Sequence, residues 1–342
     1  MSTMTAPATT ATTYAERLIG GEARLAVSPI CLGVLPFGTT VDEETSFAIL
    51  DRFVEAGGTF IDTSNNYAFW VGTGDESETV LGRWLAERGT RDDVVIATKV
   101  GGRPRHQGAG LEDAEGLSAA AIRAGLANSL RRLGTDHVDL YYAHVEDRSV
   151  PLAETMGTFG ALTREGLVRA VGVSNHPAWR VERARAIARA DGWDGYTAVQ
   201  LRYSYVQPRS GPSLEAGGHV HASPEMVDYV ASQPDVTLLA YSSLLMGAYS
   251  RPDRTLPPAY DHPGVAARMA ALRSVADDLG ATPNQVVLSW LRGGAPAILP
   301  IVGVIAAWIQ LGERPSPAEG VGMLLILAGL AVLTGTQRDV QP

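Results

Sequence analysis

Residues 94–99 read VVIATK, residues 118–133 read SAAAIRAGLANSLRRL, and residues 138–144 read VDLYYAH. The first and last segments are short and rich in apolar, β-branched or aromatic side chains, which is typical of strands. The middle segment carries apolar residues at helical spacing, with Ser118 placed to cap its start and Gly134 directly after its end. This stretch predicts two parallel strands joined by a crossover helix.

The same alternation repeats over most of the chain. Helices are predicted at residues 43–56, 76–87, 118–133, 152–165, 178–190, 224–231 and 265–279. Strands are predicted at residues 30–34, 59–63, 94–99, 138–144, 170–173, 198–202, 236–241 and 297–302. Eight strands alternating with helices predict an α/β fold, a closed (β/α)8 TIM barrel over residues 14–303, with an open doubly wound sheet as the alternative.

The open sheet would be expected to carry a dinucleotide-binding glycine motif. Gly72 and Gly74 lie in a predicted loop, and Ser77 stands where the third glycine should be, so the motif fails. No Walker loop, GxSxG elbow or HExxH motif is present either. The close histidine pair, His219 and His221, has no carboxylate or cysteine beside it as a third ligand, so we expect no metal site.

The composition limits the partners and the compartment. A formal net charge of −9 means that phosphate backbones and anionic membranes repel the chain, so nucleic acid is not expected as a partner. The single cysteine, Cys31, cannot form an internal disulfide and is expected to be a buried, inert thiol. Residues 1–13 lack the features of a signal peptide, so we expect a disordered leader and a cytoplasmic protein. The sequence does not indicate the oligomeric state.

Lysine usage singles out one position. Lys99 is the only lysine among 28 basic residues, and all the others are arginine. Lysine differs from arginine in having a compact ammonium whose pKa responds to its surroundings. Lys99 is therefore a candidate functional residue, and the alternative is a lone lysine that has merely survived in an arginine-rich chain.

Four polar residues lie at or just after the ends of predicted strands, where barrel enzymes carry their reactive groups. They are Asp62, Tyr67, Lys99 and His144. Each alone has an ordinary structural role, such as capping a turn, packing in a loop or bonding a carbonyl. Together they meet the needs of hydride addition to a carbonyl group, in which negative charge grows on oxygen and a proton must be supplied.

Tyr67 is the predicted proton donor. A free phenol with a pKa near ~10 donates poorly, so we expect Lys99 to lower the pKa of this phenol. Asp62 is expected to hold the ammonium in place and to limit the cost of burying it. A neutral His144 is expected to donate a hydrogen bond to the carbonyl oxygen of the substrate and to fix its orientation.

Six short motifs carry a family resemblance, namely LG at 32–33, FG at 37–38, DTSNNY at 62–67, SETVLG at 77–82, TK at 98–99 and GVSN at 172–175. With them the chain resembles the aldo-keto reductase family over about residues 17–302. The resemblance implies an NAD(P)-dependent oxidoreductase that reduces an aldehyde or ketone to an alcohol, or catalyses the reverse. It also implies that the four residues above are catalytic, and it makes NADP the expected cofactor, with NAD as the alternative.

The resemblance further implies which residues bind the cofactor. Ser174, Asn175 and Gln200 would bind the nicotinamide carboxamide, since their side chains supply the donors and acceptors that an amide needs. Tyr241 would stack on the nicotinamide ring, and the segment at 242–247, with Ser242, Leu244 and Gly247, would hold the pyrophosphate. An apolar pocket for a small-molecule carbonyl substrate is expected from Leu35, Phe37, Phe69, Trp70 and Tyr203.

Residues 304–342 depart from the family pattern. The family continues with a basic segment that binds the adenosine 2'-phosphate, whereas this chain becomes apolar and resembles the end of a drug/metabolite transporter superfamily protein. For this tail we expect an apolar helix that covers the barrel, rather than a segment that associates with a membrane. A recombined reading frame is a further explanation of the departure from the family pattern. Two alternative functions stay open: a cofactor-binding regulatory or interaction protein on the same barrel, and a defective or chimeric reductase without the normal C-terminal cofactor clamp.

Overall fold

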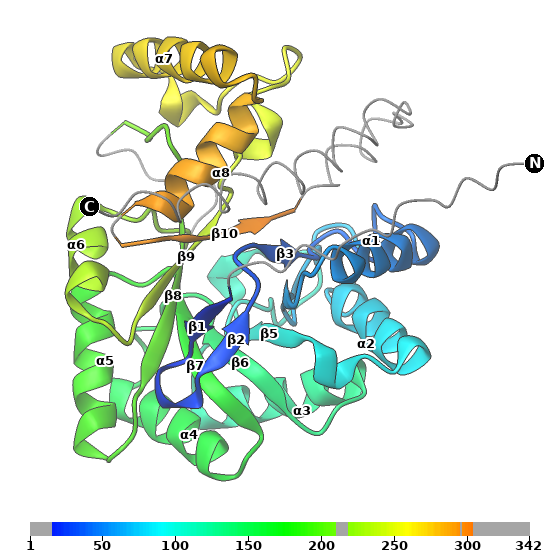
Figure 1. The fold of residues 1–342 in the computed structure, drawn as a ribbon. Helices are drawn as coiled ribbons and strands as arrows, with labels where there is room; N and C mark the ends of the chain where they lie inside the picture. The colour runs from blue at the N-terminus through cyan, green and yellow to red at the C-terminus, as the bar shows by residue number, and fades with distance from the viewer. Residues whose placement is uncertain (1–15, 210–217, 295, 304–342) are drawn as a thin grey trace, which may run out of the picture.

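A computed structural model of the chain describes residues 16–209, 218–294 and 296–303. Eight parallel strands form a closed barrel in the order β10-β3-β4-β5-β6-β7-β8-β9, because β10 pairs with β9 on one side and with β3 on the other (Figure 1). This confirms the predicted (β/α)8 barrel. The strands are β3 (Cys31–Gly33), β4 (Phe60–Asp62), β5 (Val95–Val100), β6 (Val138–Ala143), β7 (Val168–Ser174), β8 (Tyr196–Arg202), β9 (Thr237–Tyr241) and β10 (Leu299–Val302).

Helices follow most of these strands and pack around the outside of the barrel (Figure 1). Those in the described part are α1 (Glu43–Glu55), α2 (Glu76–Arg88), α3 (Ala119–Leu133), α4 (Leu152–Arg164), α5 (Ala178–Ala190), α6 (Pro224–Ser232), α7 (Pro263–Leu279) and α8 (Pro283–Gly293). The first seven match the predicted helices to within two residues at each end. Ser118 caps α3 as predicted, since its hydroxyl accepts a hydrogen bond from the backbone N–H of Ala121, and Gly134 ends the helix at φ 66°.

Two regular elements were not predicted from the sequence. One is α8, although Thr282 and Gln285 form a capping box at its start and Pro283 occupies its first position. The other is an antiparallel hairpin of β1 (Arg17–Ile19) and β2 (Leu25–Val27), whose strands are too short to show an alternating pattern. Short 3-10 helices are η1 (Gly21–Ala23), η2 (Arg91–Asp93), η3 (Leu111–Asp113), η4 (Leu245–Gly247) and η5 (Pro258–Tyr260).

The barrel interior is a packed apolar core. Cys31, Phe60, Leu140 and Leu239 from four strands lie in one buried cluster, and residues of the β1–β2 hairpin belong to the same cluster. Burial raises the pKa of the Cys31 thiol well above its usual value, in agreement with the expected inert thiol. Because the interior is filled, polar reactive groups have room only at the ends of the strands.

No helix among the described residues is long and apolar enough to cross a membrane. The predicted leader at residues 1–13 and the predicted apolar tail at residues 304–342 both lie outside the described residues.

Helix α2 ties the ends of β4 and β5 together through the SETVLG motif. The hydroxyl of Ser77 bonds to the Thr63 hydroxyl at 2.8 Å and donates to the Val34 carbonyl. Glu78 is fully buried and accepts hydrogen bonds from the Thr98 hydroxyl and from the Nε of Arg132 at 2.7 Å. Since Thr63 and Thr98 each adjoin a candidate catalytic residue, these buried contacts fix where Asp62 and Lys99 stand.

We predict that Glu78→Ala lowers the free energy of unfolding by about 3–5 kcal/mol, because it removes the buried carboxylate and leaves the shielded Arg132 guanidinium only the partly exposed Asp75 as a counter-charge. Urea denaturation followed by circular dichroism measures the change. The matched control is Arg83→Ala, which breaks the exposed pair with Glu43 and should cost less than about 1 kcal/mol. Equal losses in the two variants would show that the Glu78 contacts do not anchor α2.

Candidate active site

The four candidate catalytic residues lie together at the carboxyl end of the barrel. Asp62 is the last residue of β4, Lys99 lies near the end of β5, and His144 directly follows β6. Tyr67 comes from the loop after β4, and its ring centroid lies 6.2 Å from that of His144. The fold therefore brings together residues that are up to 82 positions apart in the chain.

Lys99 has its ammonium group fully enclosed and fully bonded. Its side chain is 0% exposed, so each N–H must find a partner inside the protein. The Nζ donates to Asp62 Oδ2 at 2.7 Å, to the Thr63 carbonyl at 2.7 Å and to Tyr67 Oη at 2.6 Å. Three acceptors for three N–H groups describe a charged ammonium, and the Tyr67 ring adds a cation–π contact at 4.5 Å.

Asp62 collects the donors around it. In addition to Lys99, its Oδ2 accepts the Tyr67 hydroxyl at 2.7 Å, and its Oδ1 accepts the Nε2 of Gln200 at 2.8 Å. A buried carboxylate with three donors is a satisfied anion, which offsets the charge of the ammonium beside it. The contact between Gln200 and Asp62 joins the predicted cofactor group to the predicted catalytic group, and sequence reasoning did not foresee it.

The pKa of Tyr67 departs from the sequence-based expectation. Burial raises the pKa of this phenol well above its usual value, and the charge of Asp62 and the hydrogen bond to it raise the pKa further. We expected Lys99 to lower it. The physical reason for the difference is that the phenol donates its proton to a carboxylate, so ionisation would place two anions side by side. The phenol is thus held in its protonated, donating form.

His144 is neutral, as expected. Burial, together with the nearby charge of Lys99, lowers its pKa well below the usual value. Its Nδ1 lies 3.2 Å from the Ser64 hydroxyl, and the same hydroxyl donates to Asn66 Oδ1 at 2.7 Å. Ser64 and Asn66 therefore help to orient the imidazole, a role that the DTSNNY motif did not reveal on sequence alone.

The predicted carboxamide-binding residues also meet at this end of the barrel. Ser174 pairs in register with Gln200 on the neighbouring strand, and its hydroxyl donates to the Gln200 carbonyl at 2.9 Å. The amide of Asn175 donates to the His144 carbonyl at 3.0 Å and accepts the Tyr241 hydroxyl at 2.7 Å. Ser174, Asn175, Gln200 and Tyr241 therefore form one connected group next to the catalytic residues.

Backbone strain is concentrated around the same end of the barrel. Six described non-glycine residues have φ between 46° and 60°, a conformation that costs about 1–2 kcal/mol per residue. Five of them follow the ends of β4, β7 and β9, namely Ala68, Asn175, Ser242, Leu245 and Met246. Such strain persists only where the surroundings enforce it, and it clusters at functional sites. The strain therefore indicates that the backbone conformation of the segment at 242–247, which also holds Leu244 and Gly247, is enforced by its surroundings.

The five residues predicted to line the substrate pocket lie in different surroundings. Trp70 is 62% exposed and Leu35 is 37% exposed, and the ring of Phe69 packs edge-on against that of Trp70. Tyr203 stacks on Trp290, a residue that the sequence analysis did not select. Phe37 is 2% exposed and belongs to the core between the barrel and the helices, so it does not reach the mouth of the barrel.

His219 and His221 each bond to another group of the protein. The Nδ1 of His219 lies 2.8 Å from the Tyr241 hydroxyl, and the Nδ1 of His221 donates to the Ala222 carbonyl at 3.1 Å. Across the described ranges no three His, Cys, Asp or Glu side chains stand close enough to hold a metal ion. Through its contact with Tyr241, His219 adjoins the candidate cofactor-binding group.

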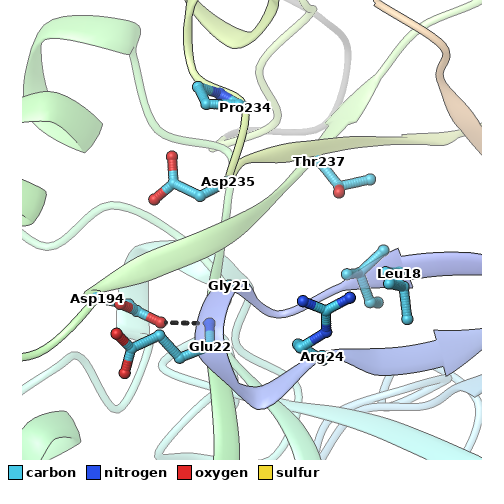
Figure 2. A pocket seen from close by; sticks show the side chains of 9 residues that line it. Leu18, Gly21, Glu22, Arg24, Asp194, Pro234, Asp235 and Thr237 are labelled. Atoms are coloured by element: carbon cyan, nitrogen blue, oxygen red, sulfur yellow. Dashed lines mark hydrogen bonds between the residues drawn. The ribbon is translucent and has the colours of Figure 1, made fainter.

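A cavity of about 560 Å³ lies at the opposite end of the barrel (Figure 2). It is lined by the β1–β2 hairpin together with Asp194, which precedes β8, and Thr237, which begins β9. The Asp194 carboxylate accepts the backbone N–H of Glu22 at 2.8 Å. Features at this end of a (β/α)8 barrel serve stability rather than chemistry, so the cavity is not the candidate active site.

Comparisons with known proteins agree with this architecture. Norsolorinic acid reductase of Emericella nidulans is 38% identical over 198 residues, which cover 55% of this chain and only 50% of that relative. Norsolorinic acid reductase B of Aspergillus parasiticus is 31% identical over 322 residues, 88% of this chain and 79% of the relative. An uncharacterized oxidoreductase of Bacillus subtilis is 32% identical over 289 residues, 83% and 85% respectively.

A model of the aldo/keto reductase family matches residues 29–307, close to the span of 17–302 that the motifs predicted. The likeness of the tail to transporter proteins stays a prediction. The family match covers more than half of the chain, and the two longer alignments cover most of both partners. The chain therefore belongs to the aldo/keto reductase family.

Proposed function

We propose that this chain reduces an aldehyde or ketone to an alcohol, or catalyses the reverse, with Tyr67 as the proton donor. The observation that carries the proposal is the buried contact of 2.6 Å between Lys99 Nζ and Tyr67 Oη. An ammonium bonded to a phenol oxygen stabilises the negative charge that grows on this oxygen as its proton leaves. The names of two relatives, both norsolorinic acid reductases, support carbonyl reduction in general.

The proton transfer follows from the hydrogen bonds around Tyr67. The phenol proton now points to Asp62, and rotation about the C–O bond redirects it to a carbonyl oxygen in the mouth of the barrel. Lys99 keeps its contact with the phenol oxygen throughout, while Asp62 remains paired with Lys99 and Gln200. A neutral His144 would donate to the same carbonyl oxygen from Nε2 and fix its position, once the Ser64 hydroxyl turns from Asn66 Oδ1 to donate to Nδ1.

The residues present fit a nicotinamide cofactor, which supplies the hydride. The amide and hydroxyl groups of Asn175, Ser174 and Gln200 are the kinds of group that bind a carboxamide. The ring of Tyr241 offers a flat face, and the strained segment at 242–247 is suited to hold a pyrophosphate with its backbone. NADP is the proposed cofactor, with NAD as the alternative, and a cytoplasmic location remains part of the proposal.

Tyr67→Phe removes only the transferable proton, so we predict that turnover falls by about 10²–10⁴-fold while NADPH binds as before. Turnover is measured by the loss of NADPH absorbance with a panel of aldehydes, and binding by quenching of protein fluorescence. Tyr229→Phe, on α6 and outside the candidate site, is the matched control and should keep its activity. More than a tenth of the wild-type rate in Tyr67→Phe would rule out Tyr67 as the acid.

The residues after β10 predict weak discrimination between the two cofactors. The polar, basic segment that would bind the 2'-phosphate is missing from the sequence, where Arg314 is the only arginine between residues 304 and 336. The dissociation constants of NADPH and NADH should therefore differ by less than about tenfold, which corresponds to one ion pair at most. Calorimetric titration of the full chain measures both constants. A preference of about a hundredfold or more for NADPH would contradict the prediction.

A further inference from the structure

Arg202 stands in the mouth of the barrel above the catalytic group. It is the last residue of β8 and lies two positions beyond Gln200, so both side chains leave the strand on the same face. That face is the interior one, because Gln200 bonds to Asp62 there. The Arg202 guanidinium lies 5.8 Å from the ring centroid of Tyr241, which packs against the interior core. Two strand residues span about 7 Å, which is the height of Arg202 above the level of Gln200.

The charge of Arg202 has no counter-charge within the described ranges. The residue is half-buried, its Nε is fully buried, and no hydrogen-bond acceptor in the described part reaches this Nε. The Arg202 side chain interacts with the hydroxyl and the ring of Tyr241, and neither of these carries a negative charge. Burial and, to a smaller extent, the Arg202 charge lower the pKa of His219 to about 4. Burial also lowers the pKa of His221. Both histidines are therefore neutral, and neither one balances or adds to the positive charge of Arg202.

Three other shielded arginines of the described ranges each have a carboxylate partner. Arg91 pairs with Asp139 at 2.9 Å, Arg132 pairs with Glu78 at 2.6 Å, and Arg185 pairs with Asp235. A guanidinium whose Nε is shielded from water and unbonded carries a desolvation cost that a carboxylate partner would offset. Arg202 carries this cost in the mouth of the candidate active site, where an incoming ligand can supply the missing anion.

We propose that Arg202 is a substrate-binding residue that recognises a carboxylate on the carbonyl compound, so that the substrates of this protein are anionic aldehydes or ketones. The inference rests on the proposed function, since it places the reacting carbonyl at Tyr67 and His144. Arginine suits this task because its planar fork can bond both oxygens of a carboxylate. Tyr203, which follows Arg202 and stacks on Trp290, gives the adjoining wall an aromatic surface.

The test compares a charged substrate with a neutral one of the same shape. Wild-type protein, Arg202→Gln and Arg202→Lys are assayed with 4-carboxybenzaldehyde and with its methyl ester, and NADPH affinity is measured for each variant. Arg183→Gln is the matched control, because Arg183 is exposed on the outer helix α5. We expect Arg202→Gln to raise KM for the acid by about 10- to 100-fold and to change KM for the ester by less than about threefold. Arg202→Lys should retain part of the preference, and Arg183→Gln all of it.

A binding measurement separates this inference from the proposed function. Calorimetry records the affinity of 4-(hydroxymethyl)benzoate and of its methyl ester for the protein with NADP bound, which requires no turnover. Tighter binding of the acid by wild-type protein, lost in Arg202→Gln, supports the anion site even if neither aldehyde is reduced and the proposed function fails. Equal losses for acid and ester, a weaker NADPH affinity in Arg202→Gln, or no preference for the acid in the wild-type protein would each overturn the inference.

Discussion

The candidate active site depends on one buried cation. The Lys99 ammonium has no contact with solvent, and three acceptors from the neighbouring strand β4 and the loop that follows it surround the ammonium. An ammonium placed there without Asp62 would face the full cost of desolvation, and Asp62 without the ammonium would be a buried anion. Burial does lower the pKa of Lys99, while the Asp62 charge acts in the opposite direction. The two charges and the phenol between them therefore form a single unit.

The rest of the fold holds this unit in place. A closed parallel barrel brings the carboxyl ends of β4, β5 and β6 to one rim, and its filled interior keeps polar side chains at that rim. Helix α2 contributes from outside through Ser77 and Glu78, which bond to the residues next to Asp62 and Lys99. Gly82 allows α2 to approach α3, since a Cβ atom there would lie 2.1 Å from the Arg132 carbonyl oxygen. The family motif thus acts through packing as well as chemistry.

The sequence was sufficient to predict the repeated strand–helix units and the polar residues at the ends of the strands. The alternation of strands and helices is strong enough to predict the barrel, and the polar residues that end apolar strands mark the catalytic rim. The sequence could not show which group accepts the hydrogen bond of the Tyr67 hydroxyl. Whether Tyr67 bonds to Lys99, to Asp62 or to both depends on differences of less than an ångström in the positions of these side chains. The resulting hydrogen bonds influence the pKa of the phenol. Nor could the sequence show that no carboxylate of the described ranges pairs with Arg202, or that Phe37 faces the outer core, because both depend on neighbours that are remote in sequence.

The proposed proton transfer requires Lys99 to be a charged ammonium bonded to the Tyr67 oxygen at neutral pH. Because Lys99 is the only lysine, a protein labelled with ¹⁵N-lysine has a single side-chain Nζ resonance, which NMR can follow through a pH titration. We predict an ammonium signal at neutral pH whose hydrogens exchange slowly with water and whose titration midpoint lies below the ordinary 10.5. A neutral amine at pH 7, or an ammonium that exchanges as fast as an exposed lysine, would contradict it.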